Sequence, residues 1–146
     1  FPSETKDTVE EVRDFLTSYR LRNVGFFAYS REEGTAAAKF DKQVSERAKK
    51  NYVNTLYDAQ YGIATQLNSS DVGKIYKCVI DDIGDVAGDY SAADGYNFYE
   101  GRTYFMSPDI DGIVHIASKT PLHLGGFYDV KITDFEGYDL IGEVAE

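Results

Sequence analysis

The chain has 146 residues, with 25 acidic side chains, 15 basic side chains and a net charge of −10 at neutral pH. This length suits one domain, or a small domain with a piece of another. A single cysteine excludes a disulfide framework and a cysteine-rich metal or cluster motif. No apolar run approaches the roughly 18 residues of a membrane span, and no signal peptide is present, so we expect a cytoplasmic protein. The start at Phe1-Pro2, without a methionine, suggests a fragment.

The negative charge is concentrated in the second half. Residues 1–72 carry 10 basic and 11 acidic side chains, a net charge of −1, whereas residues 73–146 carry 5 and 14, a net charge of −9. A surface of one sign attracts partners of the opposite sign within a screening length of roughly 8 Å at physiological salt. We therefore expect a basic protein partner for the second half, and do not expect nucleic acid.

The first forty residues have the pattern of a helix followed by a buried strand. Pro2 favours the end of a strand and a turn over residues 1–5. A helix capped by Asp7 or Thr8 should follow and end between Arg20 and Asn23. Its apolar stripe comprises Val9, Val12, Phe15, Leu16 and Tyr19. The apolar run at 24–29 then predicts a strand buried on both faces, as in one unit of a βα barrel, which cannot fold alone.

A long amphipathic helix is predicted next. After a loop at 31–40, apolar residues recur every three or four positions from Asp41 for about seven turns, and polar residues at 68–71 close the pattern. We interpret this helix as a strut between two domains. Its Lys49-Lys50 pair is expected on the solvated face.

Five short strands from Gly73 onward predict an antiparallel, OB-like barrel, although a sandwich also fits the pattern. The first strand directs Tyr76, Cys78 and Ile80 inward, and the acidic, glycine-rich residues 84–97 are expected to form a long, mobile loop. The next strands are expected at 98–106 and 113–116. Alternating apolar residues at 128–133 and 138–144, joined by a tight turn at 134–137, predict a hairpin.

Few residues in the chain stand out as chemical groups. Cys78 is expected in the core as a small hydrophobic side chain. His115 and His123 lie eight residues apart without further ligands at suitable spacing, so a metal site is not favoured. The aromatic rings of the second strand, Phe98, Tyr99, Tyr104 and Phe105, are candidates for a base-stacking platform. The scarcity of basic residues favours core packing and protein recognition, with Arg102 as an interface anchor.

Several motifs resemble a known family. Four motifs follow one another in this order: Gly-Arg-Thr-Tyr at 101–104, Ser-Pro-Asp-Ile-Asp-Gly at 107–112, Asp-Val-Lys-Ile-Thr at 129–133 and Tyr-Asp-Leu-Ile-Gly-Glu-Val at 138–144. Together they resemble the C-terminal TRAM domain of radical-SAM methylthiotransferases, in particular the branch that modifies a ribosomal protein. The residues at 1–5 and 29–37 resemble the end of the radical-SAM domain. The chain departs from the family at Ser3, and its segment around 84–97 is longer than expected.

The resemblance implies three parts: a C-terminal piece of the radical-SAM domain (1–40), a connecting helix (41–70) and a TRAM domain (71–146). It implies a parent enzyme that uses S-adenosylmethionine and 4Fe-4S clusters to add a methylthio group to the β-carbon of an aspartate in ribosomal protein uS12 of the small subunit. Lacking the cluster cysteines, the fragment is expected to bind no cofactor alone, to hold no catalytic or metal-binding residue and to be inactive. The residues that would border the cofactor cleft, or that only end the strand, are Phe1, Pro2, Tyr29, Ser30, Glu33, Gly34 and Thr35.

The charge distribution suggests that the barrel docks the basic ribosomal protein. The candidate partner-binding residues are Arg102, Tyr104, Asp109, Asp111, Asp129, Asp134 and Asp139. The alternative is the RNA-binding TRAM domain of a tRNA-modifying relative, which predicts a basic groove that the composition does not provide.

Overall fold

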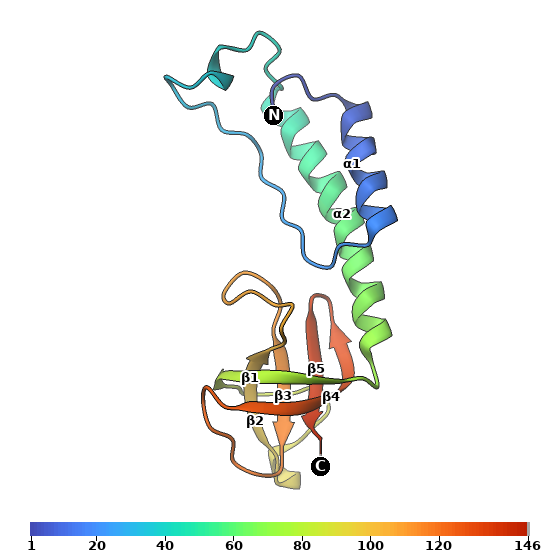
Figure 1. Ribbon diagram of the computed structural model, residues 1–146, viewed down its shortest axis with the longest axis vertical. Coiled ribbons are helices and arrows are strands. Elements are labelled where there is room, and N and C mark those ends of the chain that lie inside the picture. The colour runs from blue at the N-terminus through green and yellow to red at the C-terminus, as the bar shows by residue number, and fades with distance from the viewer. Residues whose placement is uncertain (146) are drawn as a thin grey trace. The chain divides into compact units, whose positions relative to one another are not determined.

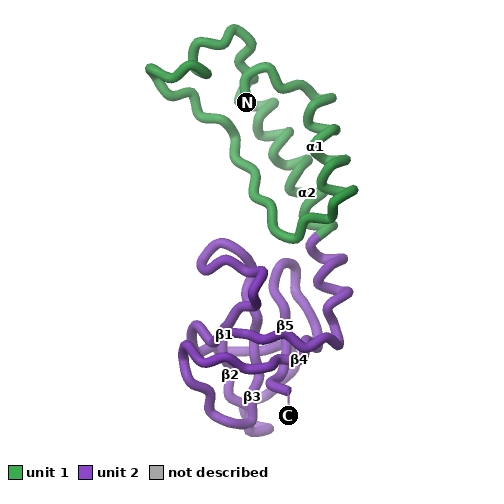
Figure 2. The backbone as a smooth tube through the Cα atoms, viewed as in Figure 1, with its two compact units in different colours: residues 1–63 green, residues 64–146 purple. Residues whose placement is uncertain are grey.

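The computed structural model describes residues 1–145. Its chain forms two compact units, Phe1–Ile63 and Ala64–Glu146 (Figure 2). Two α-helices come first along the chain and five strands follow (Figure 1). One short 3₁₀ helix lies between the two α-helices, and another lies between the first two strands. This order confirms the predicted α+β class.

Helix α1 spans Lys6–Tyr19, and its N-cap is Thr5, not Asp7 or Thr8 as predicted. The side chain of Thr5 accepts the amide of Thr8 at 3.3 Å, and the side chain of Thr8 accepts the amide of Thr5 at 2.9 Å. This reciprocal pair gives hydrogen-bond partners to two backbone amides that have no carbonyl acceptor within the first turn of the helix. The helix ends at Arg20, which has a left-handed backbone with φ of 49°.

The predicted apolar stripe of α1 is buried at only two of its five positions. Val9 and Leu16 are 5% and 2% exposed, whereas Val12, Phe15 and Tyr19 are 40% to 68% exposed. The stripe therefore lies along the helix as predicted, but three of its five side chains stay partly exposed.

Residues 24–29 are extended but form no strand in the described chain. The prediction of a strand buried on both faces is therefore wrong. Phe27 is 92% exposed. The backbone of Phe26 pairs instead with the hydroxyl of Tyr57 in helix α2 (Glu46–Asp71), which accepts its amide at 3.2 Å and donates to its carbonyl at 3.0 Å. A strand needs a neighbouring strand to pair its amides and carbonyls, and none is present in the first unit as described. Residues 1–5 likewise contain a turn and no strand.

Helix α2 begins at Glu46, five residues later than predicted. The hydroxyl of Ser45 accepts the amide of Ala48 at 3.3 Å, which is the N-cap interaction. Upstream, the side-chain amide of Gln43 donates to two backbone carbonyls at 2.9 and 3.0 Å, next to the 3₁₀ helix η1 (Ala37–Lys39). These local bonds hold the preceding residues outside the helix.

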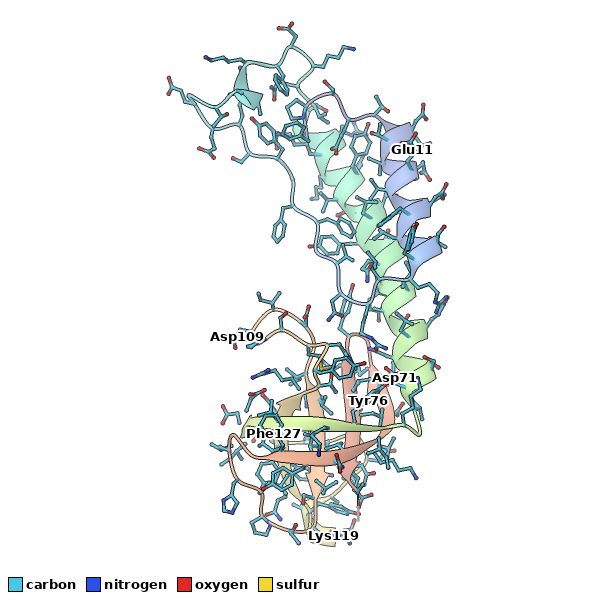
Figure 3. The ribbon with its side chains drawn as sticks, in the orientation of Figure 1. Glu11, Asp71, Tyr76, Asp109, Lys119 and Phe127 are labelled. Atoms are coloured by element: carbon cyan, nitrogen blue, oxygen red, sulfur yellow. The ribbon has the colours of Figure 1, made fainter. Side chains whose placement is uncertain are left out.

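The last turns of α2 belong to the second unit and are bonded to its barrel. The side-chain amide of Asn68 donates to the carbonyl of Gly137 at 3.0 Å. Asp71 is 1% exposed and accepts the hydroxyl of Tyr76 at 2.8 Å and the ammonium of Lys74 at 2.9 Å (Figure 3). A buried carboxylate requires such partners, and they fix the helix end to the first strand.

Five strands close into a barrel in the order β1-β2-β3-β5-β4. The strands are β1 (Ile75–Ile83), β2 (Asn97–Arg102), β3 (Val114–Ser118), β4 (Phe127–Glu136) and β5 (Asp139–Val144). Four neighbouring pairs are antiparallel, but β3 and β5 are parallel. The OB-like barrel is therefore confirmed, while the purely antiparallel pairing is wrong. A closed ring with an odd number of strands cannot alternate direction throughout, so one pair of neighbours must be parallel.

The hairpin of β4 and β5 is confirmed, with a shorter turn than predicted. Pairing continues to Glu136 and Asp139, so only Gly137 and Tyr138 remain in the turn. Gly137 has φ of 58°, which glycine adopts without strain. Conversely, β2 is shorter than predicted and ends at Arg102.

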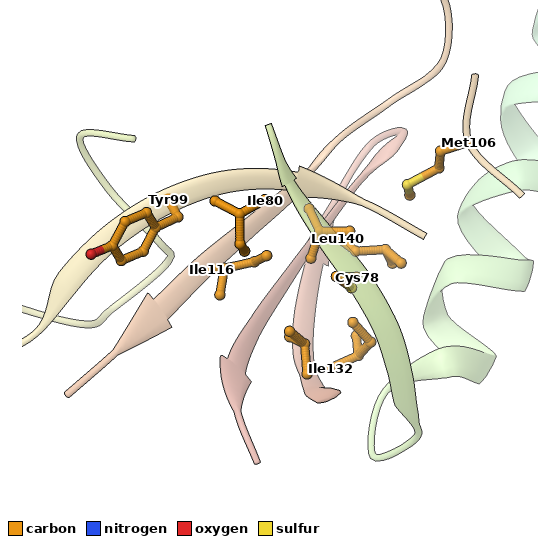
Figure 4. Close-up of a cluster of buried hydrophobic side chains, with 9 residues drawn as sticks. Cys78, Ile80, Tyr99, Met106, Ile116, Ile132 and Leu140 are labelled. Atoms are coloured by element: carbon orange, nitrogen blue, oxygen red, sulfur yellow. The ribbon is translucent and has the colours of Figure 1, made fainter. Parts of the chain in front are cut away.

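The barrel interior is filled by nine buried residues (Figure 4). They are Cys78, Ile80, Tyr99, Met106, Val114, Ile116, Val130, Ile132 and Leu140. Cys78 and Ile80 are fully buried as the alternation predicted, and Tyr76 packs at the edge of the cluster. Burial, with a smaller contribution from Asp129, raises the pKa of the Cys78 thiol to about 12. This thiol is therefore a packing residue, as predicted.

Residues 84–97 are packed against the barrel, which differs from the predicted mobile loop. Ala87 is fully buried in a second small cluster with Ala117 and Ile141. The hydroxyls of Tyr90 and Tyr96 donate to Glu143 at 3.3 and 2.8 Å. The bond to Glu143 is the main cause that raises the pKa of Tyr96 to about 12. The acidic and glycine-rich composition of this segment predicted a mobile loop. The prediction did not take into account the alanine and tyrosine residues that pack the segment against the barrel.

Candidate functional site

The first unit contains a cavity of about 470 Å³, lined mainly by apolar and aromatic side chains of α1, residues 25–29 and α2. Two of the predicted cleft residues, Phe1 and Tyr29, line it. Their rings meet edge to face with 5.2 Å between centroids. An apolar, aromatic cavity of this size suits a small organic ligand or an apolar segment of protein.

Lys49 is the buried cation of this cavity, although its sequence context predicted a solvated position. It is 7% exposed, and its ammonium donates to the carbonyl of Tyr29 at 2.8 Å and to the carboxylate of Glu46 at 2.7 Å. A buried ammonium needs such partners to offset its lost hydration. The neighbouring Lys50 is exposed as predicted.

The remaining predicted cleft residues have local structural contacts. Pro2 is buried. The hydroxyl of Ser30 donates to the carboxylate of Glu32 at 3.0 Å. The hydroxyl of Thr35 donates to the carbonyl of Glu32 at 2.8 Å and accepts the amide of Ala38 at 3.3 Å. These contacts shape the turn that follows the extended segment.

Glu33 and Gly34 line a separate depression of about 360 Å³ together with Arg31, Ala38 and Lys39. Six of the seven predicted residues are therefore divided between two concave sites and a turn, and Pro2 belongs to none of these. Only Phe1 and Tyr29 meet in the larger cavity.

The residues of this chain do not fit an iron–sulfur cluster. Such clusters are held by several cysteine thiolates, and Cys78 is the only cysteine in the sequence. Its thiol lies in the barrel core, where its raised pKa opposes the thiolate form. Within residues 1–145 no group of three or more histidine, cysteine, aspartate or glutamate side chains is arranged to hold a metal ion, and His115 and His123 are not brought into one.

The second unit carries an acidic pocket of about 350 Å³, and its charged lining residues are Asp81, Asp82, Glu100, Asp109 and Arg102. The guanidinium Nε of Arg102 lies 3.0 Å from Asp81 Oδ2. Four carboxylates thus face one cation, so the pocket keeps excess negative charge. Such a site can receive an ammonium or guanidinium group of a partner.

Loop 103–113 forms one side of this acidic pocket and exposes two large side chains. Tyr104 and Ile110 are 87% and 83% exposed, and Asp109 between them has φ of 59° (Figure 3). The carboxylate of Asp111 is used internally, since it accepts the amide of Ser107 at 2.7 Å. Asp111 therefore shapes the loop, while Tyr104 and Asp109 remain available for contact.

Two further predicted aspartates lie on β4, away from the acidic pocket lining. Asp129 forms an ion pair with Lys77 of β1 at 2.8 Å. The carboxylate of Asp134 accepts the amide of the next residue, Phe135, at 2.8 Å. Both carboxylates already have a partner within the barrel, which counting charges along the sequence does not reveal.

Asp139, at the start of β5, supports the loop that borders the acidic pocket. Its carboxylate accepts the amide of Ile113 at 2.8 Å and lies 3.9 Å from Nε2 of His115. The interaction with His115 is the main cause that lowers the pKa of Asp139, and the same interaction raises the pKa of His115. Of the seven predicted partner residues, Arg102 and Asp109 line the acidic pocket, and Tyr104 is not among its lining residues.

The sequence interpretation missed Asp81, Asp82 and Glu100. The signal was present, because Asp81 and Asp82 directly follow Ile80, the last inward residue of the predicted first strand. Their convergence with Glu100 depends on the pairing of Asp82 with Glu100 across β1 and β2.

The four rings proposed as a base-stacking platform do not form one. Tyr99 is buried in the core, and its hydroxyl accepts the amide of Leu122 at 3.0 Å. Phe98 packs in the second cluster, and Phe105 packs edge to face against Tyr76. Tyr104 is the only one of the four that is largely exposed.

Comparison with known proteins identifies related sequences for the whole chain. Residues 72–145 match the family model described as TRAM domain. The chain is 41% identical over 146 residues to the ribosomal protein uS12 methylthiotransferase RimO of Clostridium botulinum strain Eklund 17B, 36% identical over 146 residues to that of Clostridium novyi and 38% identical over 144 residues to that of Acetivibrio thermocellus.

These similarities cover 99% to 100% of the chain but only 30% of each relative. The chain thus spans less than a third of the length of the curated relatives that it matches. Neither of the two α-helices is long and apolar enough to cross a lipid bilayer.

Proposed function

Because residues 72–145 show that this chain belongs to the TRAM domain family, we propose that its barrel docks the protein substrate of a methylthiotransferase. The substrate would be ribosomal protein uS12, which the names of the RimO relatives specify. The location would be the cytoplasm, where ribosomes are modified.

The chain would act as one part of a radical-SAM enzyme that adds a methylthio group to an aspartate of uS12. S-adenosylmethionine and the 4Fe-4S clusters would supply the sulfur and radical chemistry. The cluster ligands would lie outside the present residues, since the single cysteine is buried in the barrel. Within this proposal Phe1 and Tyr29 would border the cofactor and substrate cleft, and the first unit would contribute shape and apolar surface rather than chemistry.

The acidic pocket is the observation that supports docking. Its four carboxylates surround one guanidinium, within a half of the chain that carries a net charge of −9. Proteins that bind the phosphate backbone of RNA depend on lysine and arginine, and residues 73–146 contain only five of these. A basic protein therefore fits this surface better than the RNA expected for the tRNA-modifying alternative.

The test is fluorescence anisotropy of labelled uS12 and a labelled anticodon stem-loop RNA, each titrated with the chain at about 50 and 150 mM salt. The barrel variant is Asp82→Asn with Glu100→Gln and Asp109→Asn, which keeps the Asp81–Arg102 ion pair. The matched control removes three exposed charges from the first unit, through Glu11→Gln, Asp14→Asn and Asp58→Asn.

We expect saturable, salt-sensitive binding to uS12 that weakens about tenfold or more in the barrel variant and much less in the control. Equal losses in both triple variants would show only a general charge effect and would refute docking at this pocket. Binding to the RNA alone would assign the chain to a tRNA-modifying enzyme.

A further inference from the structure

A row of paired residues runs from the acidic pocket across three strands to a histidine. Asp82 of β1 pairs with Glu100 of β2, and Glu100 pairs with His115 of β3. Tyr99 and Ile116, which follow these strands next to Glu100 and His115, belong to the barrel core, so Glu100 and His115 share the outer face. Directly opposed residues on one face have Cβ atoms about 4.5–5.5 Å apart. His115 therefore adjoins a carboxylate that lines the acidic pocket.

Asp139 connects the same histidine to the pocket wall. Its Oδ2 lies 3.9 Å from Nε2 of His115, and its Oδ1 accepts the amide of Ile113 at 2.8 Å. Oδ1 also lies only 2.8 Å from the position that a Cβ would take at Gly112. Ile113 and Gly112 both line the acidic pocket. One carboxylate thus lies against the imidazole and against two residues of the pocket wall.

His115 is surrounded by negative charge. The charged groups that act on it from the neighbouring strands are Glu100 on β2, Asp139 on β5 and Glu136 at the end of β4. The interaction with Asp139 is the main cause that raises the pKa of His115, so the imidazole changes its charge above the usual value of 6.5. The carboxylates and the guanidinium of the pocket keep their charges near neutral pH, whereas a histidine does not.

We infer that His115 controls the affinity of the acidic pocket for its basic partner, with tight docking when the imidazole is neutral and weaker docking when it is protonated. An imidazolium places one positive charge beside Glu100 and Asp139, which reduces the excess negative charge that attracts a cationic side chain. Asp139 stays ionised in both states, because its pKa is lowered, and continues to hold the amide of Ile113. The inference rests on the proposed docking function and adds a pH-dependent control of the same pocket.

The test is fluorescence anisotropy of labelled uS12, titrated with the chain between pH 6.0 and 8.5 at about 50 mM salt. His115→Gln keeps the position neutral at every pH, and His115→Lys keeps it positive. His123→Gln is the matched control, since His123 is the other histidine of the sequence and does not line the acidic pocket. Circular dichroism of each variant over the same pH range checks that the fold is unchanged.

We expect the chain to bind uS12 about two- to fivefold more tightly at pH 8.5 than at pH 6.0, because one partly screened charge changes beside the pocket. This difference should disappear in His115→Gln, which binds tightly, and in His115→Lys, which binds weakly, but persist in His123→Gln. By linkage, bound uS12 should lower the pKa of His115, which NMR of the imidazole ring measures.

An equal pH difference in His115→Gln, or tighter binding at pH 6.0 than at pH 8.5, would overturn the inference. If binding weakens in the variant that combines Asp82→Asn, Glu100→Gln and Asp109→Asn but is the same for all residues at position 115, docking stands and the role of His115 falls. If that triple variant binds uS12 as tightly as the unmodified chain at every pH, the docking proposal falls and this inference falls with it.

Discussion

In the barrel every strand has two neighbours, whereas the extended residues 24–29 of the first unit have none in the described chain. Both regions are rich in apolar residues. In the barrel Ile116, Ile132 and Leu140 are completely buried, while Phe27 and Tyr19 of the first unit are 92% and 68% exposed. Phe27 lies on backbone without a neighbouring strand, and its unpaired amides and carbonyls stay near water. Tyr19 lies in the hydrogen-bonded helix α1, so its exposure has a different cause: no other part of the described first unit covers that face of the helix.

The largest expected effect comes from Leu140→Ala in the barrel. Removing this fully buried side chain should lower the free energy of unfolding by about 2–5 kcal/mol, through lost burial and the cavity left behind. Urea denaturation would measure the loss. Alkylation of Cys78 would assign it to the barrel, since a buried thiol with a pKa near 12 reacts only when the barrel opens.

Phe27→Ala is the matched change in the first unit and should alter stability by no more than about 0.5 kcal/mol. Similar losses for the two variants would contradict the contrast between a closed core and an uncovered unit.

A smaller effect is expected at two glycines in different surroundings. A Cβ added at Gly62 in helix α2 meets no atom within 4 Å, so Gly62→Ala should raise stability by about 0.5–1 kcal/mol through helix propensity. In the barrel, a Cβ at Gly101 would collide with the carbonyl oxygen of Val79, so Gly101→Ala should lower stability by about 1–3 kcal/mol. Thermal and urea denaturation of both variants would test this, and a destabilising Gly62→Ala would indicate that the helix is tightly packed at that point.

The smallest effect concerns the pH dependence of the His115–Asp139 pair. The raised pKa of His115 gives stability that is present below its ordinary value near 6.5 and is lost as the pH rises through the folded-state value. The lowered pKa of Asp139 gives stability that is present above about 3.9 and is lost as the pH falls through its folded-state value. The pair therefore contributes most between about pH 4 and 6.5.

His115→Gln should cost a few tenths of a kcal/mol at pH 5.5 and less at pH 8, because the pair is partly exposed and screened. Urea denaturation at the two pH values would measure the difference, with His123→Gln as the control. A larger loss at pH 8 would show that the histidine acts through packing.

The period of two in the first strand was sufficient to predict Cys78 and Ile80 as inward residues, because alternation places side chains on opposite faces of any strand. The helix α2 and the hairpin followed from equally local patterns. The cap at Thr5 was missed because several threonines and aspartates lie within one turn of each other, and only backbone geometry selects among them.

The candidate site was predicted only in part. Arg102, Tyr104 and Asp109 followed from the motif and the charge distribution, but Asp81 and Glu100 became neighbours only through strand pairing. In a chain with 25 acidic residues, no local signal separates carboxylates that converge from those that merely lie on the surface.

The sequence by itself determined the order of the two helices and the five barrel strands, the inward direction of Cys78 and Ile80, and the excess negative charge of the second half of the chain, because each depends on residues close together in the chain. Only the tertiary structure decided the parallel pairing of β3 with β5, the burial of Lys49, the exposure of Phe27 and the grouping of charges around Arg102. These features depend on which distant segments become neighbours, and hydrogen bonding and burial select those neighbours for the fold as a whole.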